Sequence, residues 1–258
     1  MEGAALASLR GVTKRFGALV AVHELTLDIR AGEVFGLLGP NGAGKTTALR
    51  ILCGLLPPDA GNATIAGHDV VTEPLAARRA FAYVPDGAPL YASLTPVEHL
   101  RVVGELHGMT ASAIQTESRR LLEAFELGDR SDDPVGGFSR GMRQKTAIAC
   151  AILPRPRVLV LDEPMTGLDA ETTLVLKALL RRWADRGGAV LYTSHLLDVV
   201  ERVCDRMAVL AKGSLIAAGN LDELRAQAGQ GESLEEVFRA LTRSEDPDRK
   251  AARILGGD

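Results

Sequence analysis

A run of branched apolar residues that ends in two carboxylates restricts the fold of this 258-residue chain more than any other feature. The stretch VLVLDEPMTGLD covers residues 158–169, and its first four residues are all branched and apolar. Such a short, uniformly apolar run is typical of a strand that is buried on both faces in a parallel sheet. Asp162 and Glu163 then lie where the strand ends, and carboxylates beside a dry sheet need a cation or a reacting water.

A glycine-rich loop at residues 39–47, GPNGAGKTT, supplies such a group. It fits the pattern G-x-x-x-x-G-K-[ST] and stands between predicted strands at 25–39 and a predicted helix at 45–56, which is the context that the motif requires. Its glycines let backbone N–H groups turn inward around phosphates, Lys45 offers an ammonium group, and Thr46 offers a hydroxyl to Mg²⁺. The helix N-terminus adds its positive dipole end. The alternative is a glycine-rich turn without a ligand.

A nucleotide in this loop explains the two carboxylates. A Mg²⁺ ion bound to the nucleotide is the cation that Asp162 requires, held directly or through water. Glu163, one residue further and at the γ-phosphate end, is then placed to polarise an attacking water. A solvated pair at the end of the strand is the alternative for both residues.

Composition and charge exclude several other classes of protein. The net charge of −3 gives no bulk attraction to nucleic acid or to an acidic membrane surface. Cys53, Cys150 and Cys204 are odd in number and lie in apolar surroundings, which favours buried reduced thiols and a reducing cytosol. No apolar stretch approaches the ~20 residues that span a bilayer, and the N-terminal residues lack the layout of a signal peptide. We therefore expect a soluble chain.

Strand and helix patterns alternate along most of the chain, which predicts the α/β class. An exception is the stretch 95–127, which is predicted to be helical and begins with Thr95 as N-cap, Pro96 and the capping-box residue Glu98. Two late helices begin with capping boxes at Asn220 and Ser233. The predicted divisions of one domain at 1–243 are an α/β core at about 1–86 and 151–219, a helical insert at about 87–150, and C-terminal helices at 220–243, followed by a flexible tail at 244–258.

The segment FSRGMRQKTAIACAIL at 138–153 resembles the signature LSGGQ of ATP-binding cassette (ABC) proteins. Together with Phe16 in VTKRFG, AYVPDGAPLY, LDEPMTGLD and LYTSH, its order and spacing resemble a complete ABC nucleotide-binding domain between residues 8 and 219. The resemblance implies a P-loop NTPase fold: a RecA-like parallel core sheet, an N-terminal antiparallel β subdomain and a helical insert subdomain. It also implies ATP and Mg²⁺ as ligands and ATP hydrolysis as the activity.

The resemblance further implies a role for each site residue. Phe16 corresponds to the aromatic platform for adenine, with an ordinary core Phe as the alternative. Asp169 corresponds to the D-loop Asp that couples the two halves, and it also has a structural reading as a helix N-cap. The catalytic residues are Glu163, His195 (the switch His at the γ-phosphate) and Lys45; the metal ligands are Thr46, Asp162 and Asp86; the ATP-binding residues are Phe16, Gly39, Asn41, Gly42, Ala43, Gly44, Lys45, Thr46 and Thr47.

In this family, the signature of one subunit binds the nucleotide held by another. The resemblance implies that Ser139, Arg140, Gly141 and Met142 present N–H donors and a helix dipole to a partner's γ-phosphate. Two ATP molecules are then buried between two cassettes arranged head to tail, as a homodimer or a heterodimer. Binding closes the pair and hydrolysis releases it.

The closing segment SLEEVFRALT and the loop after AYVPD resemble the bacterial ABC-2-type exporter subfamily. In that group, the membrane permease is a separate chain and the cargo is a drug, antibiotic, lipid or polysaccharide. The implied location is the cytoplasmic face of the membrane, with docking through the helical insert and residues 86–93. The alternatives are a soluble ABC ATPase of translation or DNA repair and a regulatory module that does not hydrolyse ATP. The sequence lacks the motifs that specify GTPases and kinases, which argues against both functions.

Two departures from the family pattern concern the site. Arg140 and Met142 replace Gly and Gln of the signature, but Gly141 remains, so we expect the backbone donors to survive. Asp86 stands where most members carry Gln. It retains an oxygen ligand for Mg²⁺ but adds negative charge beside Glu163.

We therefore expect Asp86 to reduce hydrolysis without abolishing it. Replacement Asp86→Gln removes the extra charge and should raise the steady-state rate of phosphate release from ATP. A rate that stays unchanged within error would contradict a tuning role for Asp86.

Overall fold

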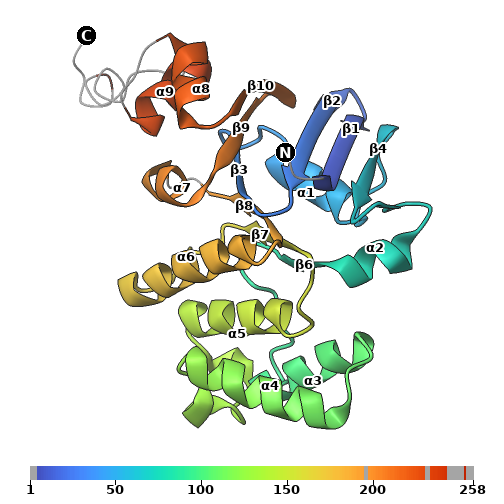
Figure 1. The fold of residues 1–258 in the computed structure, drawn as a ribbon, viewed down its shortest axis with the longest axis vertical. Coiled ribbons are helices and arrows are strands. Elements are labelled where there is room, and N and C mark those ends of the chain that lie inside the picture. The colour runs from blue at the N-terminus through green and yellow to red at the C-terminus, as the bar shows by residue number, and fades with distance from the viewer. Residues whose placement is uncertain (1–4, 195–196, 230–232, 243–252, 254–258) are drawn as a thin grey trace.

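Two β-sheets and a set of helices form the molecule, which was analysed as a computed structural model that describes residues 5–194, 197–229, 233–242 and 253 (Figure 1). The larger sheet has the strand order β10-β9-β3-β8-β7-β6, and only β10 runs antiparallel to its neighbour. Its strands are β3 (Val34–Leu38), β6 (Phe81–Val84), β7 (Val158–Asp162), β8 (Ala189–Thr193), β9 (Arg206–Ala211) and β10 (Ser214–Gly219). This is the predicted parallel core sheet.

A second, antiparallel sheet lies beside the core sheet, with the strand order β2-β1-β4-β5. Its strands are β1 (Ala5–Phe16), β2 (Leu19–Arg30), β4 (Ala60–Ile65) and β5 (His68–Asp69). This sheet confirms the predicted N-terminal antiparallel part. Together the two sheets hold α1 between them, because apolar residues of α1, β2 and the parallel strands form one continuous buried cluster.

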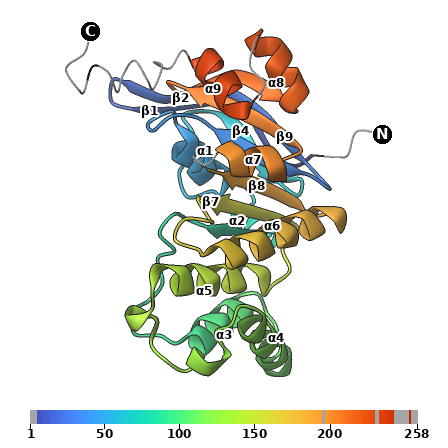
Figure 2. The same cartoon turned by 90° about the vertical axis from the view of Figure 1, so that its left-hand side faces the viewer.

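The helices cover the remaining faces of the core sheet. They are α1 (Lys45–Leu52), α2 (Pro74–Ala80), α3 (Pro96–Leu106), α4 (Ala111–Ala124), α5 (Arg140–Ile152), α6 (Ala170–Asp185), α7 (Leu197–Val203), α8 (Leu221–Ala228) and α9 (Leu234–Thr242), with short 3-10 turns at Gly128–Arg130 and Val135–Gly137. Figure 2 shows α3, α4 and α5 gathered at one end of the molecule and α8 and α9 at the other. None of the helices in the described ranges is long and apolar enough to cross a bilayer.

The strand VLVLD is buried along its whole length, as its sequence predicts. Val158 and Val160 join the cluster that contains α1, whereas Leu159 and Leu161 join the cluster formed with α5 and α6. Side chains that alternate between two dry faces explain why no polar residue occurs before the strand ends. The first carboxylate, Asp162, therefore appears only at the carboxyl edge of the sheet.

Helix boundaries follow the capping chemistry of the sequence in most places. The capping boxes at Thr95 and Asn220 are both present, and Ser233 and Glu236 exchange the equivalent pair of hydrogen bonds. Helix α1 ends at Leu52 and not at the predicted position 56. Gly54 has φ = 63°, and the N–H groups of Gly54 and Leu55 donate to the carbonyls of Ile51 and Arg50, which is a helix-terminating Schellman motif.

Two further helical features differ from the sequence expectation. The predicted helical stretch 95–127 is two helices, α3 and α4, because the chain leaves the helical conformation at Gly108, where φ is 71°. Helix α2 was not predicted. It is only seven residues long and has few apolar positions, so its periodicity gives a weak signal.

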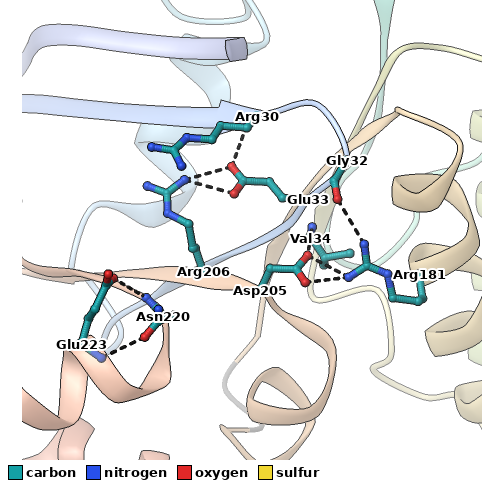
Figure 3. A network of polar contacts seen from close by, with 9 residues as sticks. All are labelled: Arg30, Gly32, Glu33, Val34, Arg181, Asp205, Arg206, Asn220 and Glu223. Carbon is teal, nitrogen blue, oxygen red and sulfur yellow. Dashed lines mark hydrogen bonds and ion pairs between the residues drawn. The ribbon is translucent and has the colours of Figure 1, made fainter. Parts of the chain in front are cut away.

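A polar network ties β3, β9 and α6 together at the amino ends of the strands (Figure 3). Arg181 of α6 donates to both carboxylate oxygens of Asp205, at 2.7 and 2.8 Å, and to Gly32 O at 3.1 Å. Asp205 also accepts from the backbone N–H of Val34 at 2.8 Å. Close by, Arg206 binds the buried carboxylate of Glu33 at 3.0 and 3.1 Å (Figure 3). These bonds fix the start of β3, whose other end leads into the glycine-rich loop.

Candidate active site

The glycine-rich loop joins β3 to α1 in a conformation that depends on glycine. Gly44, immediately before α1, has φ = 103°, and a Cβ atom there would lie 2.4 Å from Ala21 O. A side chain is thus excluded both by the backbone conformation and by the neighbouring strand. The carbonyl of Ala43 accepts from Gly213 N–H at 3.0 Å, which fastens the loop to the β9–β10 turn. The loop therefore packs closely against β2 and the β9–β10 turn, and only glycine fits at position 44.

Lys45 is the cation of this loop. Its Nζ donates to Gly39 O at 2.6 Å and to Pro40 O at 3.2 Å, so the ammonium rests on carbonyls of its own loop. Burial lowers the pKa of Lys45, while the carboxylates of Glu163 and Asp162 oppose that shift. Because the ammonium bonds only the loop's backbone oxygens among the described atoms, phosphate oxygens can replace those acceptors without breaking a structural ion pair.

The two carboxylates occupy different environments at the end of β7. Asp162 is 6% exposed and accepts a hydrogen bond at 2.5 Å from the hydroxyl of Thr193 on β8. Glu163 has φ = 51°, which is a strained conformation for this residue type, and its N–H donates to Thr193 Oγ1 at 3.1 Å. Thr193 therefore holds the side chain of Asp162 and the backbone of Glu163 at once.

The loop and the carboxylates line one cavity of about 730 Å³. The predicted site residues that line it are Phe16, Asn41, Gly42, Ala43, Gly44, Lys45, Thr46, Thr47, Asp86, Arg140, Asp162 and Glu163. Gly39 lies at the start of the same loop and contributes its carbonyl to Lys45. The cavity thus gathers residues from five separate parts of the sequence. His195, the predicted switch residue, lies outside the described residues.

Phe16 ends β1 at the mouth of this cavity and is 50% exposed. An exposed ring at a cavity is not an ordinary core Phe, so the structural alternative for this residue is not supported. The ammonium of Lys14 lies 5.8 Å from the ring centroid. An aromatic ring with this exposure can stack against a flat heterocycle.

The signature segment begins α5. Ser139 is the N-cap and accepts from Met142 N–H at 3.2 Å, which leaves Gly141 within the first helical turn. Ser139, Gly141 and Met142 do not line the cavity of their own chain. The N–H donors of this helix start are therefore not directed at the loop of the same molecule.

Arg140 and Asp86, the two unusual residues, contact each other. Arg140 Nη2 lies 3.5 Å from Asp86 Oδ1, and the Arg140 side chain crosses Gly167 on the way. Both side chains are about half exposed, so this ion pair is weak. Even so, it places a positive charge beside the extra negative charge at Asp86. Each departure could be recognised separately in the sequence, but their contact could not be predicted from it.

Asp169 is the N-cap of α6. Its carboxylate accepts from the Thr172 N–H at 2.7 Å and from the Thr172 hydroxyl at 2.8 Å, and these bonds hold the pKa of Asp169 below its ordinary value. The structural reading of this residue is therefore confirmed. Asp169 does not line the cavity, and its predicted role between two subunits stays a prediction.

Comparison with known proteins connects this site to a family. The sequence profile described as "ABC transporter" matches residues 22–166, which is more than half of the chain. The chain belongs to the ABC transporter family. It is one of the ATP-binding cassettes of that family, and ATP hydrolysis is its activity.

Similar proteins cover most of the cassette. The Nod factor export ATP-binding protein I of Burkholderia lata is 42% identical over 81% of this chain and 69% of the relative. The daunorubicin/doxorubicin resistance ATP-binding protein DrrA of Streptomyces peucetius is 37% identical over 96% of this chain and 74% of the relative. A solved ATP-binding subunit of an ABC transporter, 34% identical, superposes with a TM-score of 0.87 over 92% of this chain and 99% of its own. A dimeric bacterial ABC transporter cassette, 25% identical, gives a TM-score of 0.78 over 83% and 98%.

Thr193 bonds both carboxylate residues but was not predicted from the sequence, and neither were the cavity residues Leu19, Val20, Ala21, Thr166 and Lys212. Thr193 ends β8 and pairs in register with Asp162, which ends β7. The signal was present, since Thr193 ends a buried apolar strand and parallel strands end at one edge of the sheet. What the sequence lacked was the order of the strands, which makes β8 the direct neighbour of β7.

We expect Thr193→Val to lower kcat for ATP roughly tenfold to a hundredfold, because the orienting hydrogen bond to Asp162 is lost while the side-chain shape is retained. Thr193→Ser keeps the hydroxyl and should stay close to the wild-type rate. Steady-state phosphate release gives both values. An unchanged rate in the Val variant together with a loss in the Ser variant would show that the methyl packing of Thr193, and not its hydroxyl, matters.

Proposed function

We propose that this cassette is the ATP-hydrolysing subunit of an exporter and drives a separate membrane permease. The observation that carries the proposal is the single cavity that contains the glycine-rich loop, the ammonium of Lys45 and the two strand-end carboxylates. The relatives named above are export and resistance ATP-binding proteins, and this supports an exporter over the soluble ABC ATPases. A drug, antibiotic, lipid or similar compound is the proposed cargo.

The residues of the cavity fit a magnesium–triphosphate. The ammonium of Lys45 has only carbonyl partners among the described residues, which phosphate oxygens can replace. The proposed metal ligands are the Thr46 hydroxyl and the Asp162 and Asp86 carboxylates, which are the hard oxygen donors that Mg²⁺ prefers. When bound, Mg²⁺ neutralises charge that develops on the phosphate oxygens.

The chain's own residues then divide the chemistry of hydrolysis. Lys45 binds the outer phosphates, and Phe16 stacks against adenine. Glu163 accepts a hydrogen bond from the attacking water and so orients it toward the γ-phosphate. The strained backbone at Glu163, fixed by the Thr193 hydroxyl, supports this assignment because strain concentrates at functional positions. His195 is proposed as a further contact to the γ-phosphate.

A second nucleotide-binding subunit completes the proposed site. The Met142 N–H donates to the Ser139 side chain, so the proposed donors at the start of α5 are the N–H groups of Ser139, Arg140 and Gly141. Ser139, Gly141 and Met142 do not line the cavity of their own chain. A helix start with a polar N-cap is suited to an anion, so a partner's γ-phosphate is its proposed ligand. The existence of a similar cassette as a dimer supports this arrangement.

The proposed location is peripheral, at the inner face of the cell membrane, where the cassette docks on its permease. The segment between β6 and α3, together with the α3–α5 helices, is the proposed docking part. The formal net charge of −3 supports a protein partner over nucleic acid.

Replacement Glu163→Gln tests the proposal. It keeps the shape of the side chain but removes the charge that orients water, so hydrolysis should fall by about a hundredfold or more while ATP binding persists. The variant should then form a stable dimer with ATP and magnesium, detected by size-exclusion chromatography with light scattering. Wild type without nucleotide is the control and should elute as a monomer. Unchanged phosphate release, together with no ATP-dependent dimer, would contradict the assignment.

A further inference from the structure

A groove of about 840 Å³ lies between α4, the end of α5 and α6, far from the phosphate loop. It opens at the amino ends of the strands, since Arg157 precedes β7 and Gly188 precedes β8, whereas the two carboxylates follow β7 at its carboxyl end. Figures 1 and 2 show α6 running alongside α5, with α4 on the far side of α5. The volume lies within the range of roughly 300–1,000 Å³ that is typical of small-molecule sites.

Every charged residue that lines this groove is an arginine. They are Arg120, Arg155, Arg157, Arg182 and Arg186. Glu117, just outside the lining, binds Arg120 at 2.8 Å and Arg155 at 3.2 Å. One carboxylate therefore serves two guanidinium groups, and the groove keeps an excess of positive charge.

Three of these arginines differ from Arg120 and Arg155 in having no ion-pair partner among the described residues. Within the described part of the chain, no acidic side chain forms an ion pair with Arg157, Arg182 or Arg186. By contrast Arg181, next to Arg182, points to the other side of α6 and binds Asp205 and Asp185. The difference shows that α6 presents paired arginine to the sheet edge and unpaired arginine to the groove.

The floor of the groove is apolar. Val175, Leu179 and Trp183 stand at intervals of four residues on α6 and so share one helix face. Val175 is 48% exposed, which leaves hydrocarbon in contact with water. The indole ring of Trp183 lies against Gly188, and its buried Nε1 has no hydrogen-bond partner among the described residues. Phe125 and Ile152 close the opposite wall.

We propose that this groove binds a single-chain anionic amphiphile: its apolar chain covers Val175, Leu179 and Trp183, and its acid group pairs with Arg182 and Arg186. Arg182 and Arg186 are one helical turn apart, so both can reach one carboxylate, sulfate or phosphate group. Uncharged hydrocarbon would leave the guanidinium groups without counter-charge, and an inorganic anion would leave the apolar floor exposed. Only a ligand with both parts satisfies both surfaces.

A bound ligand would contact two parts of the fold at once. α4 and the end of α5 form one wall, and α6 with the start of β7 forms the other. The site is distinct from the nucleotide cavity, because the two share no lining residue. Binding therefore does not depend on the proposed export function.

Tryptophan fluorescence gives a direct test, because Trp183 is the only tryptophan of the chain. Sodium decanoate, decanol and decyltrimethylammonium are titrated into the full chain below their micelle-forming or solubility limits. We expect a saturable change in Trp183 emission with decanoate, with an apparent Kd at least about tenfold lower than for the other two compounds. Equal responses to all three, or no response to decanoate, would overturn the proposal.

A matched pair of double variants separates charge recognition in the groove from overall charge. Arg182→Ala/Arg186→Ala should weaken decanoate binding at least about tenfold. The control Arg101→Ala/Arg119→Ala removes the same charge from exposed arginines that do not line the groove, and should bind like wild type. Equal binding by both double variants would contradict the assignment. The ATPase rate and the melting temperature report whether each variant is folded, and the three-ligand comparison on wild type stands without them.

Discussion

The parallel pairing of β3, β8 and β7 is the constraint on which the site depends. It brings the carboxyl ends of three strands to one edge of the sheet, so the phosphate loop after β3 and the carboxylates after β7 meet although more than a hundred residues separate them. Thr193, at the end of the strand between them, joins the two carboxylate residues through one hydroxyl. The polar network at the other ends of the strands fixes the same register from the opposite side (Figure 3).

In the described part of the chain, positive and negative side chains at the carboxyl edge of the sheet offset one another without forming strong ion pairs, so they remain able to bind a ligand. Lys45 is the cation of the loop, and burial and the two carboxylates act on its pKa in opposite directions. Its hydrogen bonds go to backbone carbonyls of the loop, so among the described residues the ammonium forms no ion pair that a ligand would have to break. Arg140 and Asp86 add a second, weaker balance at the rim of the cavity. A polyanion bound with a divalent cation fits this arrangement, because its negative groups can contact Lys45 while the cation contacts the carboxylates.

The sequence predicted the parts of this structure that local chemistry determines. The buried strand before Asp162, the loop after β3 and the capping boxes at Thr95 and Asn220 each follow from a few neighbouring residues. It failed where the answer depends on distant neighbours. Strand order decides that Thr193 meets Asp162, and the path of a long side chain decides that Arg140 meets Asp86. The end of α1 was predicted wrongly for another reason. Gly54 indicates a helix end, but the apolar residues at 55 and 56 continue the helical pattern and led to the longer prediction.

We propose that each working site takes its phosphate loop from one chain and its signature from another. The most direct measurement mixes two variants, Lys45→Ala and Ser139→Phe, each of which is expected to be inactive by itself. If sites are shared between chains, half of the dimers in an equal mixture are mixed and contain one intact site, so ATP hydrolysis should recover to about a quarter of the wild-type rate. If each chain contains its whole site, the mixture should remain as inactive as its components, and that result would contradict the account.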